Sequence, residues 1–286
     1  TKPSVTRCHI LLDSLQKICL MHGIEVDYYK KLFQTAGNII ELIEKDDIPK
    51  YLLFLENVFP YMDNYNYQKG MKEIIQELKN FLKPKDIGTD SDRALLLDFQ
   101  ATLEIKPEKA IKLEKDALAQ IENITADNAR LVSNLHANLG GLYRMNGHPD
   151  LAREHMEKSI SLLDQFNLLH INDSIPQIAN YAMFLTEQQE PERGISELQK
   201  LSGIIKEYHS DDCLDYAKVQ ETLGTIYLMT ANLPQAKTHF KRAFKIYEKI
   251  WADEPEMIEA KYQEIQELYP QIGFCIGKNL SGLLTK

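Results

Sequence analysis

The residues that come nearest to a nucleotide-binding motif in this chain lie close to its C-terminal end. A phosphate-binding loop places four residues between its first glycine and a Gly-Lys pair, and a Ser or Thr follows the lysine. Three residues separate Gly273 from Gly277, and Lys278 is followed by Asn279. The stretch lacks both the spacing that cradles a phosphate and the hydroxyl that holds magnesium. We therefore predict that the chain binds no nucleotide and no other cofactor.

Two histidines raise the question of a metal site. His148 and His155 are seven residues apart, so both can lie on one face of a helix. A metal site needs a further ligand, and Glu154 and Glu157 are only generic candidates for it. The sequence contains neither a His-Glu-x-x-His motif nor a Gly-x-Ser-x-Gly motif. We predict no metal site, no catalytic residues and a protein that is not an enzyme.

The composition is ordinary for a chain that buries a core, and it indicates neither a nucleic-acid nor a membrane partner. Hydrophobic residues make up 44% of the 286 residues, and the formal net charge is -9. No run of five Lys or Arg residues is present, whereas nucleic-acid binding usually requires a basic patch. No apolar stretch has the length of a membrane span, and the four cysteines form no Cys-x-x-Cys pair. These features predict a cytoplasmic location.

Prolines reveal the elements that would hold any functional residues in place. Pro107, Pro149 and Pro191 are separated by 42 residues each time, and Pro234 continues the series with a shift of one residue. Proline suits the first turn of a helix, where its missing N–H is not needed. Each of these prolines is therefore predicted to open the second helix of a helical hairpin.

Other positions repeat in the same register. Leu139, Gly140 and Tyr143 recur 84 residues later as Leu223, Gly224 and Tyr227, and one further position holds Met156, Leu198 and Phe240. A glycine within a helix costs about 1 kcal/mol relative to alanine. The two mid-helix glycines therefore predict that a neighbouring helix comes close to the backbone there. Gly147 is predicted to form the turn before Pro149.

These positions resemble the signature of the tetratricopeptide repeat family. The match is carried by Leu139, Gly140, Tyr143, Gly147, Ala152, Met156 and Ser159, and again by Leu223, Gly224, Tyr227, Ala236, Phe240 and Ala243. His136 and Gln220 stand where the family commonly has tryptophan. The repeat of 42 residues is similar to that of kinesin light chains. The resemblance implies an all-α superhelical α-solenoid of antiparallel helical hairpins.

The regularity of the register divides the chain into three parts. Residues 1–89 are predicted to form degenerate repeat-like hairpins, and residues 90–252 the regular 42-residue repeats. Residues 253–286 are predicted to form C-terminal capping helices, because the end of a repeat array must expose one face to water.

The same resemblance implies that this chain is a protein-interaction module. Degenerate helices that lead into 42-residue repeats look like the C-terminal arm of bacterial NB-ARC (STAND-type) signalling ATPases, in which the repeats act as a sensor or scaffold. The chain begins with Thr1, so we expect the ATPase domain to lie on the same full-length chain. The alternative is a bacterial peptide-pheromone receptor of the tetratricopeptide type, although residues 1–45 lack a basic DNA-recognition helix.

The predicted binding site lies on the concave face, which the first helix of each repeat lines. Asn138 and Asn180 are 42 residues apart, and the resemblance to kinesin light chains implies that such asparagines clamp the backbone of a bound peptide. The alternative is that these asparagines only form hydrogen bonds with neighbouring hairpins, and it stays open. The full set of predicted peptide-binding residues is Asn134, Asn138, Arg144, Asn180, Met183, Glu187, Lys218, Glu221, Thr222 and Thr225.

Overall fold

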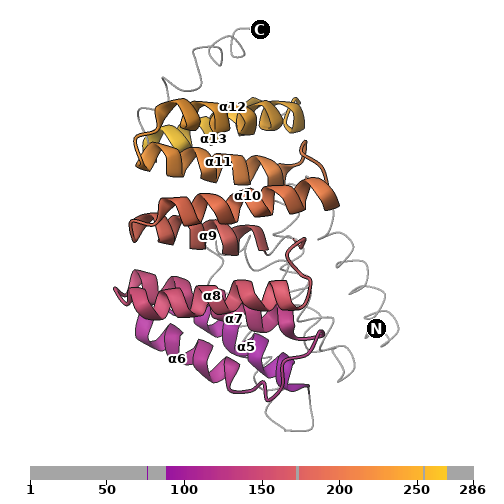
Figure 1. The fold of residues 1–286 in the computed structure, drawn as a ribbon. Helices are drawn as coiled ribbons and strands as arrows, with labels where there is room; N and C mark the ends of the chain where they lie inside the picture. The colour runs from indigo at the N-terminus through magenta and orange to yellow at the C-terminus, as the bar shows by residue number, and fades with distance from the viewer. Residues whose placement is uncertain (1–75, 77–87, 172–173, 254, 269–286) are drawn as a thin grey trace, which may run out of the picture. The chain divides into compact units, whose positions relative to one another are not determined.

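The computed structural model of the chain describes residues 76, 88–171, 174–253 and 255–268. Every regular element in these ranges is a helix, and they contain no strand. None of the described helices is both long and apolar enough to cross a membrane. The helices, labelled as in Figure 1, are α5 (Asp90–Thr102), α6 (Pro107–Leu118), α7 (Ala129–Met145), α8 (Pro149–Gln165), α9 (Ser174–Glu187), α10 (Pro191–Tyr208), α11 (Leu214–Met229), α12 (Leu233–Ile250) and α13 (Pro255–Leu268).

Several predictions fall on residues that the structure does not describe. The hairpins predicted before residue 88 lie outside the described ranges, apart from residue 76. The stretch from Gly273 to Asn279 and the end of the predicted capping segment, from residue 269 onward, also lie outside them.

The prolines open helices as predicted. Pro107, Pro149 and Pro191 are the first residues of α6, α8 and α10, and Pro234 is the second residue of α12. The turns before α8, α10 and α12 share a second feature. Each contains one residue with positive φ, and these residues are again 42 apart: Gly147 at 74°, Gln189 at 65° and Ala231 at 58°. This left-handed residue ends the first helix of each pair, as is common at helix C-termini, and it confirms Gly147 as a turn residue.

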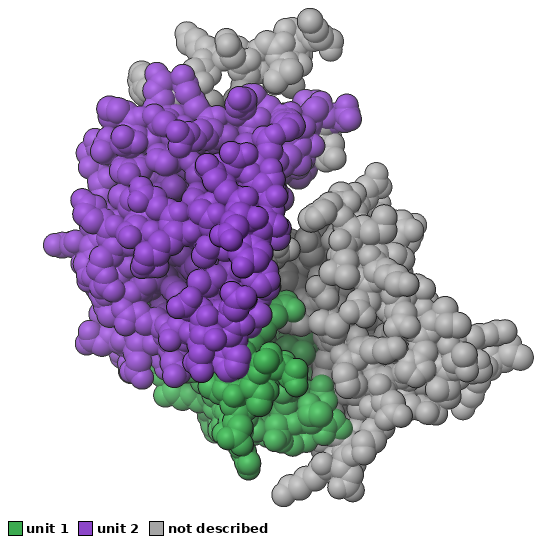
Figure 2. Space-filling model, turned by 45° about the vertical axis from the view of Figure 1, so that its right-hand side comes forward, with its two compact units in different colours: residues 1–146 green, residues 147–286 purple. Residues whose placement is uncertain are grey.

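The chain divides into two compact units, which Figure 2 colours separately. Unit 1 covers residues 1–146 and contains α5, α6 and α7. Within it α5 packs against α6, and α7 packs against both. Its core includes Ala94, Ala117 and Leu135, each fully buried. The border between the units falls inside the predicted array of residues 90–252, and the predicted domain boundaries remain predictions.

Unit 2 covers residues 147–286 and contains α8 to α13. The pairs α9–α10 and α11–α12 form helical hairpins, and the two first helices, α9 and α11, also contact each other. In addition, α8 packs against α9 and α13 against α12. One continuous core joins α9, α10, α11, α12 and α13 through buried residues that include Ala182, Leu198, Leu223 and Phe240.

Two glycines in unit 2 mark places where helices come very close. A Cβ atom on Gly224 would lie 2.9 Å from the ring of Phe240, and one on Gly194 would lie 2.6 Å from the carbonyl oxygen of Ala182. Real Cβ atoms essentially never come this near to another heavy atom. The close approach predicted at Gly224 is therefore confirmed.

Candidate functional site

The predicted binding residues lie on three helices. Asn134, Asn138 and Arg144 are on α7 in unit 1. The remaining predicted residues are on α9 and α11 in unit 2, which are the first helices of the two hairpins there. The contact between α9 and α11 brings the unit 2 residues onto neighbouring helices. The residues of α7 are considered separately, within unit 1.

In unit 1 the exposed amide of Asn138 is engaged by another helix. Its Nδ2 donates a hydrogen bond of 2.8 Å to Oδ1 of Asp98 on α5. Asn134 and Arg144 are half-buried on the same helix. Asn138 therefore contributes to packing between α5 and α7, which is the alternative role left open for the asparagines.

Asp98 also contacts a buried carboxyl group. Glu114 on α6 is 2% exposed, and the two side chains form a hydrogen bond. Burial raises the pKa of both groups, and the neighbouring Asp98 helps to raise the pKa of Glu114 to about 10. One of the two carboxyl groups therefore carries a proton at neutral pH.

In unit 2, α9 presents a mixed polar and apolar surface. Asn180 and Glu187 are exposed, and Met183 is half-buried against the core. The opposite side of the helix carries buried residues such as Ile178 and Leu185, which hold α9 in place. The N-terminal end of α9 is fixed by Ser174, whose hydroxyl donates to the carbonyl oxygens of the preceding segment.

The neighbouring helix α11 adds a positive charge and two hydroxyl groups. Lys218 is exposed, with its Nζ 3.9 Å from Oδ1 of Asp215 one turn earlier. Thr222 and Thr225 are half-buried, and the hydroxyl of Thr222 donates to the carbonyl oxygen of Lys218 at 3.0 Å. Because this bond uses the hydroxyl hydrogen, Thr222 offers a ligand only an acceptor.

Glu221 differs from the other predicted residues because its carboxylate is held within the protein. It accepts a hydrogen bond of 2.6 Å from the hydroxyl of Tyr247 on α12, and it lies 3.0 Å from Nζ of Lys261 on α13. Burial lowers the pKa of Lys261, but the carboxylates of Glu221 and Glu264 outweigh this effect and leave the pKa raised. Glu221 thus joins α11 to α12 and α13.

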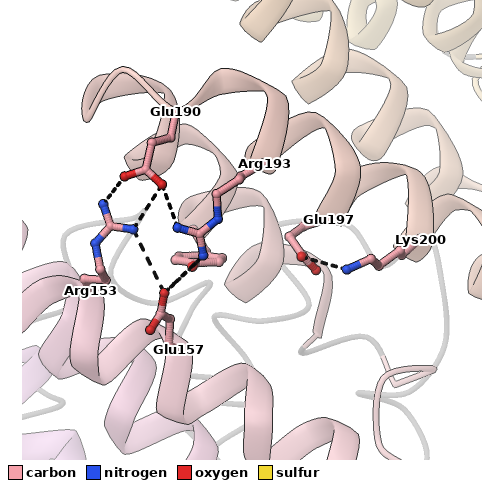
Figure 3. Close-up of polar contacts among 7 residues, drawn as sticks. Arg153, Glu157, Glu190, Arg193, Glu197 and Lys200 are labelled. Carbon is pink, nitrogen blue, oxygen red and sulfur yellow. Dashed lines mark hydrogen bonds and ion pairs between the residues drawn. The ribbon is translucent and has the colours of Figure 1, made fainter.

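A second charged cluster, shown in Figure 3, was not predicted from the sequence. Arg153 on α8 lies 2.5 Å from one oxygen of Glu190, and Arg193 on α10 lies 2.6 Å from the other. Glu157 accepts a hydrogen bond of 2.7 Å from the hydroxyl of Tyr181 and lies 3.4 Å from Arg193. Arg153, followed by Arg193, holds the pKa of Glu190 below its usual range. The cluster ties α8 to the α9–α10 hairpin.

A partial signal for this cluster was present in the sequence. Arg153 and Glu157 are four residues apart, and Glu190 and Arg193 are three apart, which are spacings that place side chains together on a helix. The contact between Arg153 and Glu190 joins different helices, so only the packing of α8 against its neighbours could reveal it.

The described residues contain no group of three His, Cys, Asp or Glu side chains that could hold a metal ion. His148 is exposed and His155 half-buried near the start of α8. The prediction that the protein has no metal site and no cofactor is not tested further by the structure.

Comparison with known proteins supports the repeat interpretation. Residues 174–249, which span α9 to α12, match the profile of the tetratricopeptide repeat family. A search of curated proteins finds no match.

Solved structures with similar folds cover most of the chain. BtubC (BKLC) from P. vanneervenii is 16% identical, with a TM-score of 0.52 over 86% of this chain and 84% of that one. The nearly identical TPR-like repeats of a protein assigned as a kinesin light chain in Podosopora anserina give 10% identity and a TM-score of 0.53, over 81% of this chain and 100% of theirs. A Rap protein complexed with Competence and Sporulation Factor gives 16% identity and a TM-score of 0.54, over 95% and 77%. These similarities confirm the predicted fold class, an all-α solenoid of helical hairpins.

Proposed function

We propose that this chain is a protein–protein interaction module that binds a peptide or a helix of a partner protein along the first helices of its hairpins. The observation that carries the proposal is the surface of α9 and α11 in unit 2. Asn180 and Lys218 are exposed there on two helices that contact each other, while the far sides of both helices are buried in one core. We call Asn180, Met183, Glu187, Lys218, Thr222 and Thr225 the α9–α11 face.

The chemistry of the α9–α11 face suits a polypeptide ligand. An asparagine amide offers both a donor and an acceptor, as the backbone of an extended peptide requires. Met183 adds a half-buried apolar contact, and Glu187 and Lys218 supply charges of opposite sign. A face with a few apolar anchors among polar groups is typical of peptide and helix recognition. Glu221 is left out of the proposed contact set because Tyr247 and Lys261 already engage its carboxylate.

The family match supports the same function. The residues that match the tetratricopeptide repeat profile include both α9 and α11. Helical repeat arrays of this kind serve as scaffolds that present extended binding surfaces, and proteins built from them are generally not enzymes. We therefore propose a cytoplasmic, non-enzymatic binding module.

We further propose that the module is the sensor or scaffold arm of a larger bacterial signalling regulator with an ATPase domain on the same full-length chain. The alternative is a peptide-pheromone-type receptor. The similarity to the Rap protein, which was solved in complex with Competence and Sporulation Factor, favours keeping this alternative. The sequence of the full-length gene distinguishes the two, because a Walker motif upstream supports the ATPase regulator and a helix-turn-helix supports the receptor.

The first prediction tests the α9–α11 face directly. Peptides selected from a random library on the immobilised full chain should bind Asn180→Ala at least about tenfold more weakly than the unaltered protein. Loss of a paired amide contact is worth on the order of 1.4 kcal/mol, which corresponds to a factor of ten in Kd. Kd values from isothermal titration calorimetry would measure the change, and thermal melts should coincide because Asn180 is exposed.

The matched control is Lys245→Ala, which removes an exposed side chain from the second helix α12. It should leave the Kd of the selected peptides unchanged. Peptides that lose affinity for the Lys245 variant but not for the Asn180 variant would contradict the proposal. The double variant of Asn138 and Asn180 is a poorer test, because it also removes the hydrogen bond from Asn138 to Asp98. Asn180 alone is therefore the cleaner test.

A further inference from the structure

The repeat register places an unusual pair of residues in the α5–α6 hairpin. Asp98 lies 42 residues before Gly140, and Glu114 lies 42 residues before Met156. The corresponding pair in the last hairpin is Gly224 and Phe240, which face each other so closely that a Cβ on the glycine would touch the ring. At the point where other hairpins have a small residue against a buried apolar one, α5 and α6 therefore have two carboxyl groups.

The geometry shows that these two groups are coupled inside unit 1. Glu114 is 2% exposed, and its Oε2 atom has no hydrogen-bond partner among the residues that the structure describes. Asp98 is half-buried and is hydrogen-bonded to Glu114. It also accepts a hydrogen bond from the side-chain amide of Asn138. All three described helices of unit 1 therefore meet at the carboxyl pair: α5 through Asp98, α6 through Glu114 and α7 through Asn138.

Two carboxyl groups can form a hydrogen bond with each other only if one of them keeps a proton. Burial and the charge of Asp98 raise the pKa of Glu114 to about 10, and the Asn138 amide only partly opposes this effect. An uncompensated charge in so buried a position raises the free energy of the folded state. The pair is therefore stable with one shared proton and unstable without it.

The other charged groups on these helices do not neutralise the pair. On α5, Arg93 pairs with Asp90, and Asp92 caps the helix at Thr89. On α6, the Nζ of Lys115 lies over the ring of Tyr143. The basic residues of α7, namely Arg130, His136 and Arg144, are not among the groups that shift the pKa of Glu114.

We propose that Asp98 and Glu114 form a proton-dependent latch, in which one shared proton holds α5, α6 and α7 together and its loss above neutral pH opens them. The folded unit keeps a proton that an exposed glutamate releases near its ordinary pKa of 4.5. The stabilising effect is therefore complete below that pH and is lost as the pH rises toward about 10. The inference rests on unit 1 alone and does not depend on the proposed binding function.

Hydrogen exchange of the full chain, followed by mass spectrometry and corrected for intrinsic rates, tests the latch. Peptides from α5–α7 and from α9–α12 are compared in the same sample between pH 6 and pH 8. If the opening of these helices releases one proton, the local opening constant of α5–α7 should rise by about tenfold for each unit of increasing pH. Over the whole range this is a rise of about 100-fold. The α9–α12 peptides should change much less.

Two variants and one control complete the experiment. Glu114→Gln removes the titrating group at nearly constant volume, and the double variant Asp98→Ala/Glu114→Leu restores the small and apolar pair of the other hairpins. Both should make the opening constant of α5–α7 nearly independent of pH in this range. Glu108→Gln, at an exposed position of the same helix, should keep the dependence of the unaltered protein. The latch is wrong if the unaltered chain shows less than about a threefold change, or if whichever variant folds retains the full change.

Discussion

At the scale of single residues, two glycines of α10 show how the same residue type serves different purposes. Gly194 lies against the backbone of α9, where a Cβ would be 2.6 Å from the carbonyl oxygen of Ala182. Gly203 lies nine residues later on the same helix, and a Cβ there would meet nothing within 4 Å. The first glycine is therefore required by packing, whereas the second only weakens the helix.

The second prediction follows from this difference. Gly194→Ala should destabilise the protein by about 1–2 kcal/mol, because forced displacement of a backbone contact exceeds the gain of up to about 1 kcal/mol in helix propensity. Gly203→Ala should stabilise it by about 0.5–1 kcal/mol. Urea unfolding followed by fluorescence would measure both, since the chain has one tryptophan and it lies in unit 2, where Trp251 stacks on Tyr247. Equal effects of the two substitutions would show that the close approach is absent.

The carboxyl pair of unit 1 belongs to the same scale. Asp98 and Glu114 occupy positions that are filled by Gly224 and Phe240 in the last hairpin. A change of two residues converts an apolar contact into one that depends on a proton, while the helical register is preserved.

At the scale of elements, the charged cluster around Glu190 joins α8 to the next hairpin. Arg153 contacts Glu190 through its guanidinium, and its Cζ lies 5.5 Å from the centre of the Phe184 ring. Both charged partners are partly exposed, with 28% and 34% of their side-chain surfaces accessible. Solvent and salt therefore weaken the attraction.

The third prediction concerns this cluster. Arg153→Met keeps an unbranched apolar side chain beside Phe184 but removes the cross-helix charge contacts, and it should destabilise unit 2 by about 1 kcal/mol at low salt. The difference should shrink in 1 M NaCl, where the Debye length is only about 3 Å. Urea midpoints at the two salt concentrations would measure it.

Lys200→Met is the control for this prediction. Lys200 pairs with Glu197 at 2.9 Å within the same helix, as Figure 3 also shows, and forms no ion pair with another helix of the described residues. Its replacement should leave the urea midpoint unchanged. A loss in the Arg153 variant that is independent of salt would indicate that packing against Phe184, rather than charge, connects α8 to the hairpin.

At the scale of the whole molecule, the two units are expected to respond to pH in opposite directions. Unit 1 depends on a proton retained by Glu114. Unit 2 contains His239, which is half-buried, stacks on Tyr227 and is hydrogen-bonded through Nδ1 to Gln220. Burial, followed by the charge of Arg242, lowers the pKa of His239 from 6.5 to about 4. The folded unit 2 therefore keeps this histidine neutral where the unfolded chain takes up a proton.

The fourth prediction is the resulting loss of stability in unit 2 as the pH falls. His239 contributes stability above its unfolded pKa of 6.5, and this contribution is lost as the pH falls toward about 4. Because the ring is partly exposed, we expect a loss of only about 1 kcal/mol between pH 7 and pH 5, after allowing for solvent screening. Urea unfolding followed by Trp251 fluorescence at several pH values would measure the change.

His239→Gln should remove most of this pH dependence, because glutamine is neutral throughout the range. His209→Gln is the control, since His209 is an exposed histidine of the same unit, and it should keep the pH dependence of the unaltered protein. If both variants retain that dependence, His239 is not the group responsible.

The sequence by itself determined the helices and their order. Proline restricts the backbone and lacks a donor, so Pro107, Pro149 and Pro191 could only suit helix starts, and the structure places them there. The 42-residue register likewise identified which positions face a neighbouring helix. Such signals are local or periodic, and they act through the conformation of a single chain segment.

Only the tertiary structure decided which polar side chains meet. The register put Glu221 on the same face as Thr222, but the packing of α12 and α13 engages its carboxylate with Tyr247 and Lys261. The contact of Asp98 with Glu114 and that of Arg153 with Glu190 likewise join residues on different helices. Such contacts depend on how two helices cross and how far each is rotated about its axis. Those quantities are fixed by the packing of many side chains together, so residue spacing along the chain does not contain them.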